Sequence, residues 1–392
     1  MMSVSTHTAT PVAPKTGTPE AIPLVRPTVE PDSTLLSRMD DVLRSGMLTN
    51  GAWVKRFEEA AAAYLGVRNV VAVSNCTAGL MLVLRSVGRA REVVLPSFTF
   101  MATGHVAHWN AQNVLFADSD PHTWTIDPAD CAGRTSTADA VVGMHTFGTP
   151  CDVNALERSA GARQVPVILD AAHGFGSRYP DGAMVGTKGL AEVFSLSPTK
   201  PLSAGEGGLV TTDDDNLAQE LRIGRDYGNP GDYDARFAGL NARMPELSAL
   251  VGLSALERFP HWLERRMSLV QRYRDNLADL PGLTFQQVPE GARSSYKDLG
   301  VQVDPDTFGL DRTALARLLS AEGISSRSYF DPPLHRQTAY RGDFAPPALP
   351  VTDRLAARMI TLPLYSHMPE DDVDRVCDAV RRAHVDGSPH AV

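Results

Sequence analysis

The feature that most constrains the fold is an alternation of short apolar runs with helical segments, which begins near residue 69. Seven apolar or β-branched runs predict strands, at residues 69–74, 92–96, 113–118, 139–145, 165–171, 191–197 and 207–212. Most are apolar almost throughout, as expected for strands that helices cover on both faces. Segments between them, such as 78–88 and 101–110, predict helices. The alternation indicates an α/β domain with a large, mainly parallel mixed sheet.

The last two predicted strands are joined by residues 198–206, a segment too short for a helical crossover. They therefore predict an antiparallel hairpin, at either the edge or the centre of the sheet. The acidic run that follows, at residues 213–215, predicts a solvated helix start.

Beyond residue 246 the pattern changes. A long, amphipathic, charge-rich segment predicts a helix that is interrupted near Pro260, because proline removes a helical hydrogen bond. Strand-like pieces at 283–288 and 296–303 and helices around 312–322 and 370–384 predict a smaller α+β domain. We therefore expect a flexible N-terminal tail (1–22), a large domain (23–255) and a small C-terminal domain (256–392).

Composition excludes several classes of protein. The hydrophobic fraction of 43% and the charged fraction of 21% are typical of a soluble globular chain. The net charge of −9 argues against nucleic acid or an anionic membrane as a partner. The four cysteines are widely spaced, without a CxxC pair, so they predict neither a metal site nor a disulfide framework. With no apolar h-region at the N-terminus, we expect a cytoplasmic protein.

Two residues near strand ends carry the first chemical signal. Asp170 ends an apolar strand, where ligands bind in open α/β sheets, although a turn or capping aspartate explains it equally well. Lys200 follows the next strand and precedes the Gly-rich segment GEGG. A lysine that forms a Schiff base needs a desolvated pocket that lowers its pKa. An ordinary loop lysine is the alternative.

A third feature joins these two. The segment SNCTAGL places Cys76 and Thr77 at the predicted start of a helix, where free backbone N–H groups suit a phosphate. An ordinary helix cap is the alternative reading of these residues. Together, a phosphate turn, a carboxylate and a lysine are what pyridoxal 5′-phosphate (PLP) requires. Phe98 and Phe100 are candidates for the aromatic face, with core packing as the alternative.

At this point the chain resembles the DegT/DnrJ/EryC1/StrS family of PLP-dependent sugar aminotransferases. The resemblance runs from the PLVRPT segment near residue 24 to residue 376, through AVSNCTAGL, LPSFTFMAT, ILDAAHGFG, FSLSPTKPLSAGEGG, LNARMPELSALVGL and YFDPPLH. It implies the PLP-dependent aminotransferase fold of type I. Lys200 would form the Schiff base and Asp170 would pair with the pyridinium nitrogen.

The resemblance also implies roles for other residues. Phe100 would stack on the cofactor ring and His173 would contact its 3-hydroxyl side, while Ser195 with the Cys76–Thr77 turn would hold the phosphate. Asn241 would reach the phosphate of the partner subunit in a homodimer. Substrate contacts are expected from Thr49, Asn50, Tyr329 and His335, although packing beside Pro332 and Pro333 is an alternative for His335. Arg243 and Arg327 are further charged candidates.

The sequence departs from the pattern of its relatives in two places. Many of them have Gly or Ala at Cys76, and many have SFHPxK where this chain has SLSPTK. Some relatives replace the lysine with histidine and act as dehydratases, so Lys200 favours transamination. The GEGG segment resembles that of relatives that act at C4 of the sugar. The form GDGG is often seen in relatives that act at C3.

The resemblance implies an enzyme that transfers an amino group from L-glutamate to a keto group of a nucleotide-linked deoxysugar, in antibiotic or surface-glycan biosynthesis. Two alternatives remain open at this stage. One is a relative that acts on a keto-cyclitol, an octose or another keto compound. The other is a catalytically silent protein of the same fold that acts as a regulator.

Overall fold

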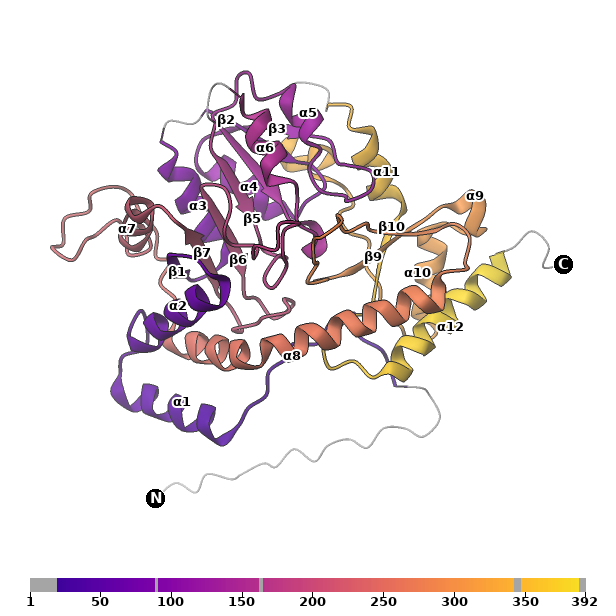
Figure 1. Cartoon of the computed structure of the whole chain (residues 1–392), viewed down its shortest axis with the longest axis horizontal. Helices are drawn as coiled ribbons and strands as arrows, with labels where there is room; N and C mark the ends of the chain where they lie inside the picture. The colour runs from indigo at the N-terminus through magenta and orange to yellow at the C-terminus, as the bar shows by residue number, and fades with distance from the viewer. Residues whose placement is uncertain (1–19, 89–90, 162–164, 342–346, 388–392) are drawn as a thin grey trace.

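The computed structural model describes residues 20–88, 91–161, 165–341 and 347–387. Two sheets organise these residues (Figure 1). The strands are β1 (Asn69–Val73), β2 (Glu92–Pro96), β3 (Asn113–Ala117), β4 (Ala140–Met144), β5 (Val167–Asp170), β6 (Ala191–Ser195), β7 (Gly208–Thr212), β8 (Leu283–Phe285), β9 (Leu299–Val303) and β10 (Met359–Leu362).

The helices surround these sheets and connect most of the strands. They are α1 (Ser33–Ser45), α2 (Ala52–Leu65), α3 (Cys76–Ser86), α4 (Met101–Trp109), α5 (Pro128–Ala132), α6 (Val153–Ser159), α7 (Asp215–Gly224), α8 (Glu246–Leu277), α9 (Pro305–Phe308), α10 (Arg312–Ala321), α11 (Pro350–Arg358) and α12 (Glu370–Gly387). The side chain of Asp214 caps α7 by accepting from two backbone N–H groups, so the acidic run is a helix start, as predicted.

The large sheet has the strand order β1-β7-β6-β5-β4-β2-β3. Neighbouring strands from β6 to β3 are parallel, whereas β7 is antiparallel to both β6 and β1. The mainly parallel mixed sheet is therefore confirmed. The predicted hairpin is β6–β7, and it lies one strand in from the edge because β1 pairs with the far side of β7.

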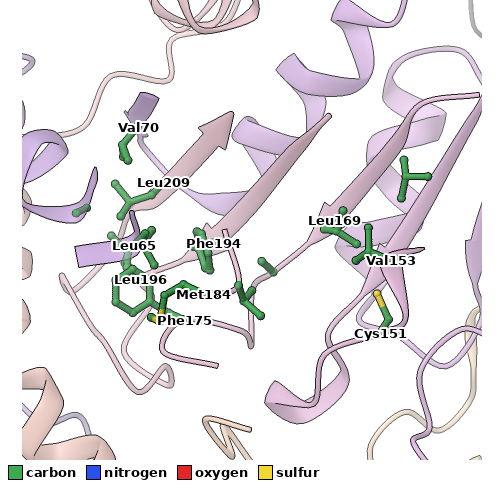
Figure 2. Close-up of a cluster of buried hydrophobic side chains, with 14 of the residues drawn as sticks. Leu65, Val70, Cys151, Val153, Leu169, Phe175, Met184, Phe194, Leu196 and Leu209 are labelled. Atoms are coloured by element: carbon green, nitrogen blue, oxygen red, sulfur yellow. The ribbon is translucent and has the colours of Figure 1, made fainter. Parts of the chain in front are cut away.

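Successive strand residues face opposite layers of helices, as the period of two in a strand requires. Val193 packs in the core formed with α3, α4 and α7, whereas its neighbour Phe194 packs in the core formed with α2, α6 and α8. Phe57 of α2 and Phe259 of α8 belong to this second core. Figure 2 shows part of it, where Phe175 lies edge-on to Phe194 with ring centroids 5.3 Å apart.

Helix α8 corrects one expectation. It runs without interruption through Pro260, which lies on its exposed side. The buried neighbours Phe259 and Leu263 hold the helix against the large core, so the loss of one hydrogen bond does not end it. Its C-terminal half, including Tyr273, packs in the core of the C-terminal region. The expected boundary at residues 255/256 thus falls inside a helix that serves both cores.

The C-terminal region contains an antiparallel sheet, β10-β9-β8, with α10 and α12 packed beside it. Residues 1–19 of the predicted tail lie outside the described residues. Ile22, at the end of that tail, is buried in this core and its N–H donates to Gly323 at 2.9 Å. Among the described helices, none has the length and apolar character needed to cross a membrane.

Candidate active site

A cavity of about 340 Å³ lies where the carboxyl ends of β5 and β6 meet the turn after β1. Many of the residues singled out from the sequence line it. They are Cys76, Thr77, Phe100, Asp170, His173, Ser195, Lys200, Arg327 and Tyr329. Phe98, the other aromatic candidate, is fully buried in an aromatic core instead.

Asp170 is the last residue of β5, and only 2% of it is exposed. One carboxylate oxygen accepts from the hydroxyl of Thr103 at 2.7 Å and the other from the N–H of Ala172 at 3.0 Å. Burial raises the pKa of Asp170, while these hydrogen bonds and the charge of Lys200 oppose that rise. A cation such as a protonated pyridine nitrogen would stabilise the ionised carboxylate here.

A second hydroxyl extends this arrangement. Thr99 Oγ1 lies 2.7 Å from Thr103 Oγ1, and both residues are buried. Each threonine has one hydroxyl proton, and an ionised carboxylate can only accept. Thr103 therefore donates to Asp170, and its oxygen can accept from Thr99. The sulfur of Met144, 2.6 Å from Thr99 Oγ1, is the other acceptor for the single hydroxyl proton of Thr99.

His173 is held as a neutral ring. Its Nδ1 accepts from the backbone N–H of Phe147 at 3.2 Å, and the two rings are stacked with centroids 6.1 Å apart. Burial, together with the nearby charge of Lys200, keeps the pKa of His173 well below its usual value. Because Nδ1 accepts, the proton resides on Nε2, which is a hydrogen-bond donor for a ligand in the cavity.

The predicted phosphate turn is the first turn of α3, which begins at Cys76, two residues earlier than expected. Asn75 caps the helix with its side chain, and the helix itself offers no acceptor to the N–H groups of Cys76 and Thr77. Gly208 explains the GEGG segment, because a Cβ there would lie 2.7 Å from the nitrogen of Cys76. Ser195 is paired with Gly208 across the hairpin and lines the same cavity.

Cys76 is buried, and its thiol donates to the carbonyl of Val193 at 3.5 Å. Burial raises the pKa of this thiol well above its usual value, and the charge of Asp170 adds to the effect. The thiol is therefore protonated, and the contribution of Cys76 to an anion site comes from its backbone N–H. A glycine or alanine at this position would offer the same N–H.

Lys200 lies in the turn between β6 and β7, partly buried at the cavity. Burial and, after it, the charge of Lys297 lower the pKa of Lys200 to about 8, while the nearby carboxylates of Asp298 and Asp170 oppose the shift. Near physiological pH, Lys200 is thus a neutral amine in a substantial fraction of the molecules. This is the state that a Schiff-base lysine needs.

Sequence reasoning missed three contributors to this cavity. Lys297 and Glu206 line it, and Thr103 supports Asp170 from below. Glu206 is inside the GEGG segment already singled out. Lys297 is the second residue of the strand-like piece predicted at 296–303, and a lysine at the edge of an apolar run was the available signal.

Four predicted site residues do not line the cavity. Thr49 and Asn50 precede α2 and hydrogen-bond to the carbonyl of Met244. Asn241 is exposed, and its side-chain oxygen accepts from Arg243 at 3.3 Å. A substrate contact by Thr49 and Asn50, and a role of Asn241 in the site of a partner subunit, stay predictions.

His335 is the fourth, and its contacts favour the packing alternative over a substrate contact. Only 1% of it is exposed, and its Nδ1 lies 2.6 Å from the hydroxyl of Ser97. Its Nε2 lies 3.1 Å from a carboxylate oxygen of Asp353. Burial lowers the pKa of His335 despite this carboxylate. The ring is thus held between Ser97 and Asp353.

Comparison with known proteins identifies the arrangement. Residues 30–381 match the model of the DegT/DnrJ/EryC1/StrS aminotransferase family. The spore coat polysaccharide biosynthesis protein SpsC of Bacillus subtilis (strain 168) is 32% identical over 363 residues, which cover 88% of this chain and 93% of that protein. The crystal structure of DesI in the presence of its TDP-sugar product has a TM-score of 0.87 at 38% identity, covering 93% of both chains. DesV of S. venezuelae, in complex with a ketimine intermediate, has a TM-score of 0.86 at 28% identity, covering 93% of this chain and 98% of that one.

The fold and the site thus define a PLP-dependent enzyme of fold type I. The residues present fit the cofactor, since a buried carboxylate, a lysine with a lowered pKa and a helix start that only glycine can approach share one cavity. The chain belongs to the DegT/DnrJ/EryC1/StrS aminotransferase family.

The lowered pKa of Lys200 has a measurable consequence for cofactor capture. Only the neutral amine attacks an aldehyde, so the rate at which apoenzyme captures PLP should rise with pH and level off above about 8. Stopped-flow absorbance of the bound cofactor measures this rate. A rate that keeps rising towards the ordinary lysine value of 10.5 would contradict the prediction.

The hydrogen bond from Thr103 should matter for cofactor binding. Thr103→Val removes a donor to a buried carboxylate, so we expect the Kd for PLP to rise about tenfold. Equilibrium dialysis of the apoenzyme measures the effect. Thr149→Val is the matched control, because Thr149 is fully buried and its hydroxyl has no partner among the described residues. Equal PLP affinity of Thr103→Val and wild type would show that the hydroxyl is dispensable.

Proposed function

We propose that this enzyme transfers the amino group of L-glutamate to a keto group of a nucleotide-activated deoxysugar. One observation carries the proposal: Lys200 and Asp170 line a single cavity in a chain similar to DesI, whose structure was determined with its TDP-sugar product. Glutamate would load the cofactor with nitrogen and the ketosugar would then collect it. The two substrates would use the cavity in turn.

Bound PLP supplies an electron sink that carries the amino group between the two substrates. Lys200 would hold the cofactor between turnovers and would move the proton between C4′ and the reacting substrate carbon. Its pKa of about 8 suits both tasks, since the side chain can accept and release a proton near neutrality. Asp170 would keep the pyridine nitrogen protonated, with Thr103 and Ala172 fixing its two oxygens.

The other cavity residues would hold the cofactor in place. The Nε2–H of His173 would donate to the 3-hydroxyl, since its other nitrogen already accepts from Phe147. Phe100, 48% exposed and at the start of α4, would cover the ring face. The N–H groups of Cys76 and Thr77 would bind the phosphate with the hydroxyl of Ser195.

The nucleotide diphosphate would approach through the exposed mouth of the cavity. Arg327 is exposed there, and it donates to the hydroxyl of Tyr329, another cavity residue, at 3.2 Å. Thr49, Asn50 and Asn241 would complete the site from the partner subunit of a homodimer. Leu36 and Leu43 are both more than half exposed on α1, and their spacing of seven residues puts them on the same face of that helix, which supports a partner surface there.

Two further inferences accompany the proposal. The four cysteines are buried free thiols, which supports a reducing compartment such as the cytoplasm. A keto-cyclitol or an octose remains the second candidate acceptor. A silent regulator is disfavoured, because such a protein has no need for Asp170, Ser195 and Lys200 together at one cavity.

A screen of nucleotide ketosugars tests the acceptor. Enzyme that has been treated with L-glutamate is mixed with each ketosugar, and the absorbance of the cofactor reports whether the amino group has left. We expect at least one nucleotide ketosugar to restore the original spectrum, with Lys200→Ala inactive but folded as judged by circular dichroism. If only a keto-cyclitol restored the original spectrum, the proposed acceptor would be wrong.

Mixed dimers test the role of Asn241. A subunit with Lys200→Ala and a subunit with Asn241→Ala together form one site that has both residues only if Asn241 acts across the interface. We expect such hybrids to recover PLP binding and part of the turnover. Hybrids that bind PLP no better than the Asn241→Ala homodimer would show that Asn241 does not act in trans.

A further inference from the structure

A buried ion pair borders the cavity. Lys297 lines the cavity, and its ammonium lies 2.8 Å from both carboxylate oxygens of Asp298. The two side chains are only 3% and 2% exposed. Removing two charges from water is costly, so an ion pair at this depth is weak evidence for a contribution to stability alone. A role in binding is the natural alternative.

The backbone of Lys297 is fixed from two directions. Its N–H donates to the carbonyl of Phe147 at 2.8 Å, and its carbonyl accepts from Arg266 of α8 at 2.7 Å. Arg266 is itself buried and also donates to the carbonyls of Tyr296 and Leu364. The ammonium is therefore presented to the cavity from a rigid support, which suits the recognition of a small ligand.

The ammonium has one further hydrogen bond to give. It has three N–H donors, and its hydrogen-bond acceptors within the described ranges are the two oxygens of Asp298. Its nitrogen also lies 5.4 Å from the ring centroid of Tyr329, another cavity residue. A carboxylate in the cavity could thus bind Lys297 without breaking the pair with Asp298.

The proposed reaction creates a need for such a group. The donor carries a carboxylate on the carbon that reacts at Lys200, whereas the sugar ring that later occupies the same place is uncharged. Within the described part of the chain, the charged cations that line the cavity are Lys200, Lys297 and Arg327. Lys200 is engaged by the cofactor, and Arg327 is exposed at the mouth. Lys297 is also the charged group that acts most strongly on Lys200.

We propose that Lys297 binds the α-carboxylate of the amino donor, and that Asp298 balances its charge when the neutral sugar ring takes the donor's place. The inference rests on the proposed function, because it assumes an amino-acid donor and a sugar acceptor. The pair of Lys297 and Asp298 would allow one cavity to bind both a charged donor and an uncharged sugar ring. Lys297 would therefore determine donor affinity and leave acceptor affinity unaffected.

The first test changes the ligand and leaves the protein intact. L-glutamine keeps the α-carboxylate and loses the γ-carboxylate, whereas L-isoglutamine keeps the γ-carboxylate and loses the α-carboxylate. Binding to wild-type holoenzyme is followed by the absorbance of the cofactor. Because a hydrogen bond to a charged group is lost, we expect isoglutamine to bind about 10- to 100-fold more weakly than glutamine. Equal affinities would overturn the proposal.

The second test changes the pair. The double variant Lys297→Gln/Asp298→Asn replaces two buried charges with two amides and leaves no unpaired charge. We expect it to bind α-methyl-L-glutamate, a donor analogue without an α-proton, about 10- to 100-fold more weakly. The preference for glutamine over isoglutamine should disappear, while PLP affinity and the KM for the ketosugar remain as in wild type. Unchanged donor affinity, or an equal loss for donor and acceptor, would refute the assignment.

A control uses a lysine–aspartate ion pair away from the cavity. Lys188 contacts Asp181 at 2.6 Å, and neither residue lines the cofactor cavity. Lys188→Gln/Asp181→Asn should leave every one of these affinities unchanged. The outcome for wild type separates the two proposals: if L-glutamate does not change the cofactor spectrum, the proposed donor is wrong. The α-carboxylate test then applies to whichever amino acid does react, because every such donor carries that group.

Discussion

The pairing of β6 with its two neighbours is the constraint on which the active site depends. Its parallel register with β5 sets Val193 opposite Asp170, and its antiparallel register with β7 sets Ser195 opposite Gly208. A shift of one residue in either register would reverse which side chains face α3 and which face α8. The carboxylate, the phosphate turn and the lysine of the following loop would then no longer share a cavity.

Several polar groups that are costly to bury lie around these strands, and each has a hydrogen-bond or ion-pair partner close by. Asp170 accepts from Thr103 and Ala172, His173 accepts from Phe147, and Lys297 is balanced by Asp298. In a low-dielectric cavity each charge acts strongly on its neighbours. The same environment lowers the pKa of Lys200 and raises that of Asp170. The interactions that stabilise the buried charges of the cavity thus also set the pKa values of the residues that would hold the cofactor.

The large sheet and the main cofactor residues could be predicted from the sequence, because strands that are buried on both faces consist of apolar runs. Asp170, Lys200 and the Cys76 turn were found because each lies at the end of such a run or soon after it. Thr103 and Lys297 were missed, since their roles depend on contacts between segments 67 and 97 residues apart from Asp170 and Lys200 along the chain. Pro260 was misread because local propensity takes no account of the two cores that hold α8.

Helix α8 has 32 residues, and a straight helix of that size is about 48 Å long. It crosses beneath both sheets in Figure 1. Its Arg266 donates a hydrogen bond to the backbone carbonyl of Lys297. A hinge between the large and small domains would have to bend this rod and pull one wall away from the cofactor cavity. Because α8 packs in both cores, it ties them together. For the proposed donor and acceptor, exchange through loops and side chains at the mouth would distort the chain less than a rotation of one core against the other.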